Sequence, residues 1–163
     1  MPIFWGDQRL VHMGRGDAYV WSKFLNLHEK EYFNYQYDVR VGQPVVMDPA
    51  WPEWVKKSAE ALSQKRIDVV MENQNNIFVV EVKVSARARA IGDLISYRNL
   101  YHTRFVPRKP VRPFLVAAQI DADALYTIKE LNMLYEVVCL SGRFDISNIQ
   151  NLTARTRQDP AKR

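Results

Sequence analysis

The stretch RIDVVMENQNNIFVVEVKVSARARAIGDLISY, residues 66–97, decides the fold. Two runs rich in β-branched residues, 66–72 and 77–84, flank a polar connection of four residues, 73–76. Such runs are typical of β-strands, and a short polar connection between them predicts a β-hairpin. The segment that follows, 86–105, predicts a helix, and the prolines that come after it prevent the helix from continuing.

The segments on either side of this hairpin complete an α/β pattern. Helical spacing of apolar residues, or a capping residue such as Asp121, predicts helices over 17–27, 53–65 and 122–131. Alternating or wholly apolar runs predict strands over 32–41, 114–120 and 135–140. The predicted order α, β, α, β, β, α, β, α, β indicates a mixed sheet with helices on both faces.

The composition indicates one folded domain. With 163 residues, 47% of them hydrophobic and 25% charged, the chain matches a single globular domain of roughly 150 residues. We assign residues 1–146 to this domain and 147–163 to a basic, polar tail. In the tail four basic side chains against Asp159 give +3 of the total net charge of +5. The remaining charge is weak evidence for a nucleic-acid partner.

Cysteine use and hydropathy bear on the cellular location. Cys139 is the sole cysteine and cannot form an internal disulfide, and the first residues lack the pattern of a signal peptide. No run approaches the roughly 18–20 apolar residues of a membrane-spanning helix. We therefore expect a cytoplasmic protein without a membrane segment. Cys139 falls in the predicted strand 135–140 and is expected in the core. Trp51 and Trp54 are expected to pack beneath helix 53–65.

Three charged side chains interrupt the apolar strands of the hairpin. Strand alternation puts Glu81 and Lys83 on one face of the second strand, and hairpin pairing brings Asp68 alongside them. Burying these charges costs free energy unless they find partners. One interpretation is a cross-strand salt bridge between Asp68 and Lys83, with Glu81 solvated at a strand end. The other is a divalent cation held by Asp68 and Glu81, whose oxygens suit Mg²⁺ or Mn²⁺.

The combined pattern of IDVV, a polar turn, VVEVK and a helix beginning ARAIGDLISY resembles the PD-(D/E)XK nuclease superfamily, which has the restriction-endonuclease-like fold. The resemblance covers roughly residues 17–140, with 53–65 as an inserted helix. It implies that Asp68 and Glu81 are the two acidic metal ligands and that Lys83 is the lysine of the motif. It also implies that the backbone carbonyl of Val82 is a metal ligand.

The resemblance implies further roles on the two helices beside the motif. Asp17 matches an acidic residue on the first helix, and Tyr97 matches a tyrosine on the helix after the motif. Asp93, one turn before Tyr97, stands where the family commonly has glutamine. The implied activity is hydrolysis of DNA phosphodiester bonds, assisted by Mg²⁺ or Mn²⁺. Lys83 would orient or deprotonate a water molecule, or stabilise the charge that develops on the phosphate.

Basic residues near the motif are candidate contacts to DNA phosphates. Arg87 and Arg89 follow the motif strand, and Arg108, Lys109 and Arg112 lie in the proline-rich link. A solvated loop explains the same charges. A homodimer would suit paired cuts in a duplex. The alternative function is a structural or nucleic-acid-binding component of a larger assembly, such as a phage particle, which would place the protein in the virion.

Overall fold

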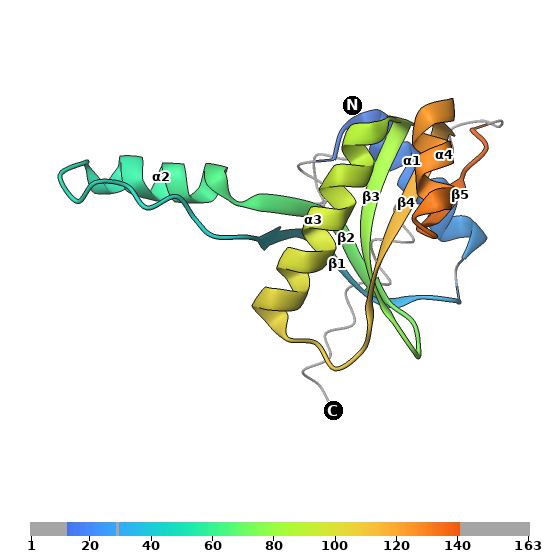
Figure 1. Cartoon of the computed structure of the whole chain (residues 1–163), viewed down its shortest axis with the longest axis horizontal. Helices are drawn as coiled ribbons and strands as arrows, with labels where there is room; N and C mark the ends of the chain where they lie inside the picture. The colour runs from blue at the N-terminus through green and yellow to red at the C-terminus, as the bar shows by residue number, and fades with distance from the viewer. Residues whose placement is uncertain (1–12, 29, 141–163) are drawn as a thin grey trace.

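The computed structural model describes residues 13–28 and 30–140, and it contains a five-stranded sheet in the order β1-β2-β3-β4-β5 (Figure 1). The strands are β1 (Phe33–Val41), β2 (Lys65–Glu72), β3 (Ile77–Ala86), β4 (Val111–Ile120) and β5 (Leu134–Val137). The first three pair antiparallel and the last three pair parallel. The predicted α/β class with a mixed sheet is confirmed. The predicted tail, 147–163, lies outside the described residues.

The helices are α1 (Arg15–Leu27), α2 (Glu53–Ser63), α3 (Ala88–Phe105) and α4 (Ala122–Glu130). As predicted, helices cover both faces of the sheet, and α1, α3 and α4 are the ones that do so. Parallel strands need crossover connections, and α3 and α4 supply them on one face while α1 packs on the other. This order, with α2 inserted, is the one that the sequence resemblance implies. No helix within 13–28 and 30–140 is long and apolar enough to cross a bilayer.

The core lies on both sides of the central strands. On one side Trp21 and Phe24 of α1 stack at 5.1 Å between ring centroids and pack against β3 and β4. On the other side Leu94 of α3 and Ile128 of α4 are fully buried against the same strands. Burial on both faces explains why β4 is almost wholly apolar. The predicted cap of α4 is confirmed, because Asp121 Oδ1 accepts the N–H of Ala124 at 2.7 Å.

Two boundaries differ from the predicted ones by three residues, and several others differ by one or two. β4 begins at Val111 rather than at residue 114, so Pro113 lies inside the strand and pairs with Val79. The proline is tolerated because β5 pairs with β4 only from Phe114 onward, so no strand hydrogen bond to β5 requires the backbone N–H that Pro113 lacks. The last strand, β5, ends at Val137. Cys139 therefore lies after the strand and is exposed, and its predicted place in the core is wrong.

The segment between β1 and β2 projects away from the sheet (Figure 1). It consists of an extended link, 42–52, and α2, none of whose residues is buried. Trp51 and Trp54 are 52% and 73% exposed, so the prediction that they pack beneath the helix is wrong. The apolar spacing of α2 correctly predicts a helix, but such spacing does not specify what covers the apolar face.

His28, at the end of α1, ties this helix to the edge of the sheet. Its Nε2 lies 2.8 Å from Glu136 of β5, and its Nδ1 lies 2.9 Å from Glu31. Burial lowers the pKa of His28, but the hydrogen bonds and the charges of Glu136 and Glu31 together outweigh this effect and raise it. The pKa of His28 therefore lies above its ordinary value of 6.5, and the charged imidazole stabilises the docking of α1.

We predict that Glu136→Gln destabilises the protein in a pH-dependent way. Because the pKa of His28 is raised in the folded state, its contribution to stability is complete below about pH 6.5 and is lost as the pH rises through the folded value. The urea midpoints of wild type and variant should therefore differ most at about pH 5.5 and converge at about pH 9. Glu130→Gln, on the exposed side of α4, is the control. An equal gap at both pH values would contradict this role of His28.

Candidate active site

The sheet forks between β2 and β3, and two carboxylates fill the gap. Backbone pairing of the hairpin ends at Val69 and Val80. Beyond that point the N–H of Val82 donates to Asp68 Oδ2 at 2.9 Å, and the N–H of Val84 donates to Asp17 Oδ1 at 2.7 Å. Backbone N–H groups need acceptors, so these side chains replace the missing strand. The fork opens the sheet at this position.

A kink in β1 and β2 accompanies the fork. Tyr37 and Val69, which pair with each other, pack with the α1-side core, whereas the next pair, Val39 and Ile67, packs with the α3-side core. Normal strand alternation would put both pairs on one face. The break falls at Asp38, which has a φ of 53°, a left-handed conformation that aspartate tolerates. Asp68 stands opposite Asp38 in this register, at the same kink.

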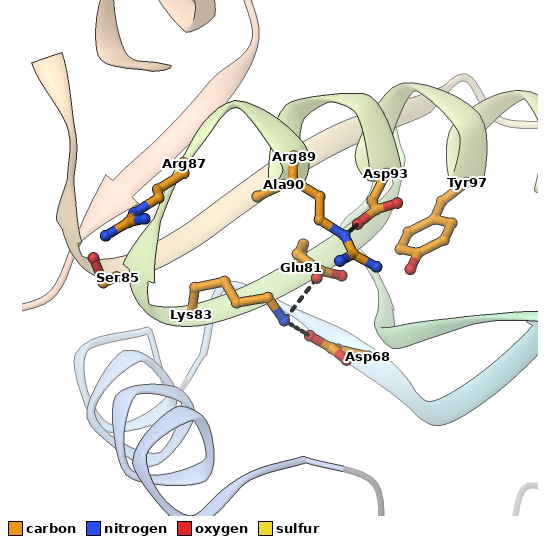
Figure 2. A pocket seen from close by; sticks show the side chains of 9 residues that line it. All are labelled: Asp68, Glu81, Lys83, Ser85, Arg87, Arg89, Ala90, Asp93 and Tyr97. Carbon is orange, nitrogen blue, oxygen red and sulfur yellow. Dashed lines mark ion pairs between the residues drawn. The ribbon is translucent and has the colours of Figure 1, made fainter. Parts of the chain in front are cut away.

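An open cleft of about 450 Å³ lies at the fork, between the strands and α3 (Figure 2). Its lining comes from β2, β3, the turn after β3, and α3. The lining residues are Asp68, Glu81, Lys83, Ser85, Arg87, Arg89, Ala90, Asp93 and Tyr97. Asp68, Glu81 and Lys83, which the sequence predicts to meet, therefore share one cavity that is open to solvent.

Lys83 joins the two acidic side chains of the cleft. Its Nζ lies 2.7 Å from Glu81 Oε1 and 3.7 Å from Asp68 Oδ2 (Figure 2). The side chain of Glu81 is only 5% exposed. The salt bridge between Lys83 and Asp68 that one interpretation predicted is thus present, but the solvated Glu81 of that interpretation is wrong. Glu81 is buried because it lies midway along the central strand β3, beneath α3.

The electrostatics of the cleft favour taking up positive charge. Burial, reinforced by the charge of Asp68, raises the pKa of Glu81 to about 7, although Lys83 opposes the shift. Burial also raises the pKa of Asp68, and the nearby charges of Asp17 and Asp38 add to this. Burial lowers the pKa of Lys83, but Asp68 and Glu81 outweigh it, so the net shift is upward. One ammonium group therefore compensates the buried Glu81 carboxylate and the partly buried Asp68 carboxylate only in part.

The donor atoms of the cleft fit a hard divalent cation. Glu81 Oε2 is buried and has no hydrogen-bond partner within the described part of the chain. The carbonyl of Val82 points to the same edge of β3 as its N–H, and thus toward Asp68. No cluster of three or more Asp, Glu, His or Cys side chains suited to a metal occurs in 13–28 and 30–140. Two carboxylates with water suffice for Mg²⁺.

The other predicted catalytic residues take different places. Tyr97 lines the cleft, and burial together with the charges of Glu81 and Asp93 raises the pKa of its phenol. Asp93 also lines the cleft, with Oδ2 3.7 Å from Arg89 Nε. Asp17 stands outside the lining and holds the backbone of β3. Its charge still acts on the carboxyl of Asp68.

The predicted phosphate contacts fall into two groups. Arg87 and Arg89 line the cleft. The second group, Arg108, Lys109 and Arg112, lies by the hairpin turn, where the ammonium of Lys109 binds Glu72 at 2.8 Å. Ile77 pairs with Val111, and Lys83 pairs with Ala117 six residues further on. At about 3.3 Å per residue, the second group lies roughly 20 Å along the sheet from Lys83.

Asp38 is the residue of this region that sequence reasoning missed. It stands opposite Asp68 in the register of β1 and β2, and its charge raises the pKa of Asp68. The available signal was an acidic residue within the alternating strand YFNYQYDVRV. That signal does not show which strand pairs with β1, so it does not predict that Asp38 lies next to Asp68.

Comparisons with known proteins give distant structural similarity. No protein-family model and no curated protein matches the chain. The protein in a complex of EndoMS with double-stranded DNA is 15% identical to this chain, with a TM-score of 0.47; the match covers 78% of this chain and 46% of that one. A repair endonuclease from Pyrococcus abyssi is 14% identical, with a TM-score of 0.40; the match covers 64% of this chain and 39% of the endonuclease. A protein of unknown function is 12% identical, with a TM-score of 0.48; the match covers 85% of this chain and 78% of that protein.

The chain spans less than half the length of the first two of these proteins. In the described residues, the helix, strand, hairpin, helix, strand, helix, strand order is that of the restriction-endonuclease-like fold implied by the sequence resemblance.

We predict that Glu81→Gln stabilises the metal-free protein at neutral pH. Because the folded pKa of Glu81 is raised to about 7 from an ordinary 4.5, wild type loses stability as the pH rises between these values. In EDTA the variant should be more stable than wild type at about pH 8, by on the order of 1–3 kcal/mol, and equal to it at about pH 4.5. Urea unfolding across this range measures both, with Glu130→Gln as control. Parallel curves for variant and wild type would show that Glu81 is not penalised by burial.

Proposed function

We propose that the protein is a metal-dependent nuclease that hydrolyses DNA phosphodiester bonds in the cleft at the fork. One observation carries the proposal: Asp68, Glu81 and Lys83 converge in an open cavity, and Glu81 keeps a buried oxygen without a hydrogen bond to any described residue. Arginines on the cleft wall suit a polyanionic substrate. The resemblance of the sequence to the PD-(D/E)XK superfamily supports the same activity.

Asp68, Glu81 and the carbonyl of Val82 would hold Mg²⁺ or Mn²⁺. Bound there, the cation would lower the pKa of a water molecule and neutralise charge on the scissile phosphate. The residues themselves supply the reason for binding. Their pKa values are raised because burial penalises both carboxylates and Lys83 compensates them incompletely. A hard cation removes this penalty, so the free energy of burial contributes to metal affinity.

Lys83 would act as a fixed positive charge. Its pKa is raised by Asp68 and Glu81 despite burial, so the ammonium stays protonated at neutral pH. A protonated amine cannot accept a proton from water, but it can donate hydrogen bonds to a phosphate oxygen. Placed on the wall of the cleft, it would stabilise the negative charge that grows during the displacement. The pKa of Tyr97 is also raised, so its phenol remains a hydrogen-bond donor.

Arg87 and Arg89 would bind the phosphates on either side of the scissile bond. Arg89 is almost fully exposed and pairs with Asp93 one turn further along α3, which orients its guanidinium toward the cleft (Figure 2). Such contacts fix the position of a duplex without reading its sequence. Arg87 and Arg89 thus position the substrate, while Asp68, Glu81 and Lys83 carry out the chemistry.

The site predicts separate effects for its acid and its lysine. Asp68→Asn should abolish both Mn²⁺ binding, measured by calorimetry, and DNA cleavage. Lys83→Ala should still bind Mn²⁺ but cleave about 10²–10⁴-fold more slowly, because it loses charge stabilisation rather than a ligand. Lys129→Ala, an exposed lysine of α4, is the control and should behave as wild type. Undiminished cleavage by both site variants would refute the nuclease proposal.

The two arginine groups should differ in their effect on DNA affinity. Replacing Arg87 and Arg89 by alanine should weaken duplex binding and lower the salt dependence, by about one unit of slope for each lost phosphate contact. The matched pair of substitutions, Arg108→Ala and Arg112→Ala, removes the same charge about 20 Å away and should change binding little. Fluorescence anisotropy in EDTA at several salt concentrations measures both effects. Equal losses would place the duplex along the whole sheet instead of at the cleft.

A further inference from the structure

Two arginine side chains, Arg40 of β1 and Arg66 of β2, lie directly opposite each other in the sheet. Residues opposite each other on antiparallel strands share one face, with Cβ atoms about 4.5–5.5 Å apart, and like charges in this position are destabilising. Among residues 13–28 and 30–140, no carboxylate forms an ion pair with either guanidinium group. An anion bound between the two side chains would stabilise this arrangement.

The arginine pair points away from α3 and is open to solvent. Val39, Val41 and Ile67, the neighbours of the pair along the two strands, pack with the α3-side core. Because successive side chains of a strand point to opposite faces, Arg40 and Arg66 lie on the other face. On that face α1 covers β3 and β4, and Arg40 is exposed while Arg66 is half-buried. A ligand can therefore reach both guanidinium groups.

The pair stands on one branch of the fork. Beyond the last backbone pair of the hairpin the strands separate, with β1 and β2 on one side and β3 on the other. Arg66 is two residues from Asp68 on the first branch, about 7 Å along the strand. On the second branch Lys83 and then Arg87 follow Glu81. Both branches thus carry positive charge, and the acidic centre of the cleft lies at their junction.

Other positive groups gather around the pair, at the base of the projecting segment 42–64, which we call the arm (Figure 1). Lys65 is the neighbour of Arg66 on β2 and is exposed. From the end of α3, Arg104 Nη1 donates to the backbone carbonyl of Arg40 at 2.9 Å. Four basic side chains at the base of the arm therefore favour an anionic ligand.

The acidic side chains of the cleft do not balance this charge. Asp68 Oδ2 accepts the N–H of Val82 at 2.9 Å and lies 3.7 Å from Lys83 Nζ. Glu81 Oε1 lies 2.7 Å from the same ammonium. Both acids thus act inside the cleft, beneath α3, while the arginine pair stands outside it, on the other face of the first branch.

We propose that Arg40 and Arg66 together bind one backbone phosphate of the DNA whose scissile bond lies in the cleft. The inference rests on the proposed function, which supplies DNA as the ligand. A sheet layer is about 10 Å thick and the major groove is about 12 Å wide, so a duplex seated on the open end of the fork overhangs both faces of the first branch. Each strand carries a phosphate about every 3.4 Å along the helix axis, which places one within about 7 Å of the scissile phosphate.

A phosphate between the two guanidinium groups satisfies both. Its oxygens accept hydrogen bonds from the N–H donors of each arginine, and its negative charge removes the repulsion between them. Arg87, on the other branch, would hold a different phosphate. The DNA would then be held from both branches of the fork, with the cleft between the two contacts.

A double-mutant cycle in duplex affinity tests whether the two arginines share one phosphate. Arg40→Ala and Arg66→Ala should each weaken binding about tenfold, the loss expected for one hydrogen bond between charged groups. The double variant should lose little more than either single variant, because both side chains act on the same group. In the double variant the slope of log affinity against log salt should fall by about one unit, for one lost phosphate contact. Fluorescence anisotropy in EDTA measures all three variants.

The matched control is Lys30→Ala combined with Lys129→Ala, which removes two exposed positive charges elsewhere and should bind as wild type. Single losses that multiply in the double arginine variant, with a slope change of about two units, would overturn the proposal, and so would undiminished binding. Cleavage in Mn²⁺ is measured separately. Coupled arginines in a protein that does not cut DNA would refute the nuclease activity alone, and uncoupled arginines in a protein that cuts would refute the shared phosphate alone. A wild type without affinity for DNA would refute both.

The repulsion between the two arginines can be tested without DNA. Arg66→Met keeps an unbranched apolar side chain but removes one of the facing charges. At low salt its urea midpoint should lie above that of wild type, and the two midpoints should converge in about 1 M salt, where the screening length is about 3 Å. Arg108→Met, at an exposed position, is the control and should leave the midpoint unchanged. A lower midpoint for Arg66→Met at low salt would overturn the proposal, because the guanidinium would then already have a partner in the folded chain.

Discussion

Beyond Val80 the edge of β3 that faces β2 has no strand partner among residues 13–28 and 30–140, and this gap determines how the candidate site is built. The N–H groups of Val82 and Val84 turn to the carboxylates of Asp68 and Asp17. Satisfying the backbone thus brings acidic side chains to the place where the sheet opens. The same fork leaves room for a cleft between β2, β3 and α3. Backbone hydrogen bonding and the position of the carboxylates are one structural feature.

The cleft carries more buried negative charge than its lysine can balance. Glu81 lies in the middle of a central strand, where burial is nearly complete, and Asp68 lies beside it at the kink. A core position of this kind ordinarily holds an apolar residue. Keeping two carboxylates there costs stability in the metal-free protein, and under the proposed function that cost would become affinity for a cation. The position would then trade stability for activity.

The arm contrasts with this compact region. It leaves the sheet at the pair formed by Val41 and Lys65, and its helix is held to the link by few polar contacts. Its apolar residues contribute nothing to the core of the described chain, because none of α2 is buried. Sequence periodicity predicted the helix correctly and its packing wrongly. A hydrophobic stripe shows which face avoids water, but a second surface must exist to cover it.

The sequence alone was sufficient for the sheet, the hairpin and the convergence of Asp68, Glu81 and Lys83. Alternation and β-branched content act over a few residues, and a hairpin fixes which strands are neighbours. Only the tertiary structure decided that Asp17 holds the β3 backbone, that Asp38 stands opposite Asp68, and that the second basic group lies far from the cleft. These relations join residues that are distant in sequence. They depend on the strand order, on the kink in β1 and β2, and on where β2 and β3 stop pairing, and none of these features produces a pattern in the local sequence.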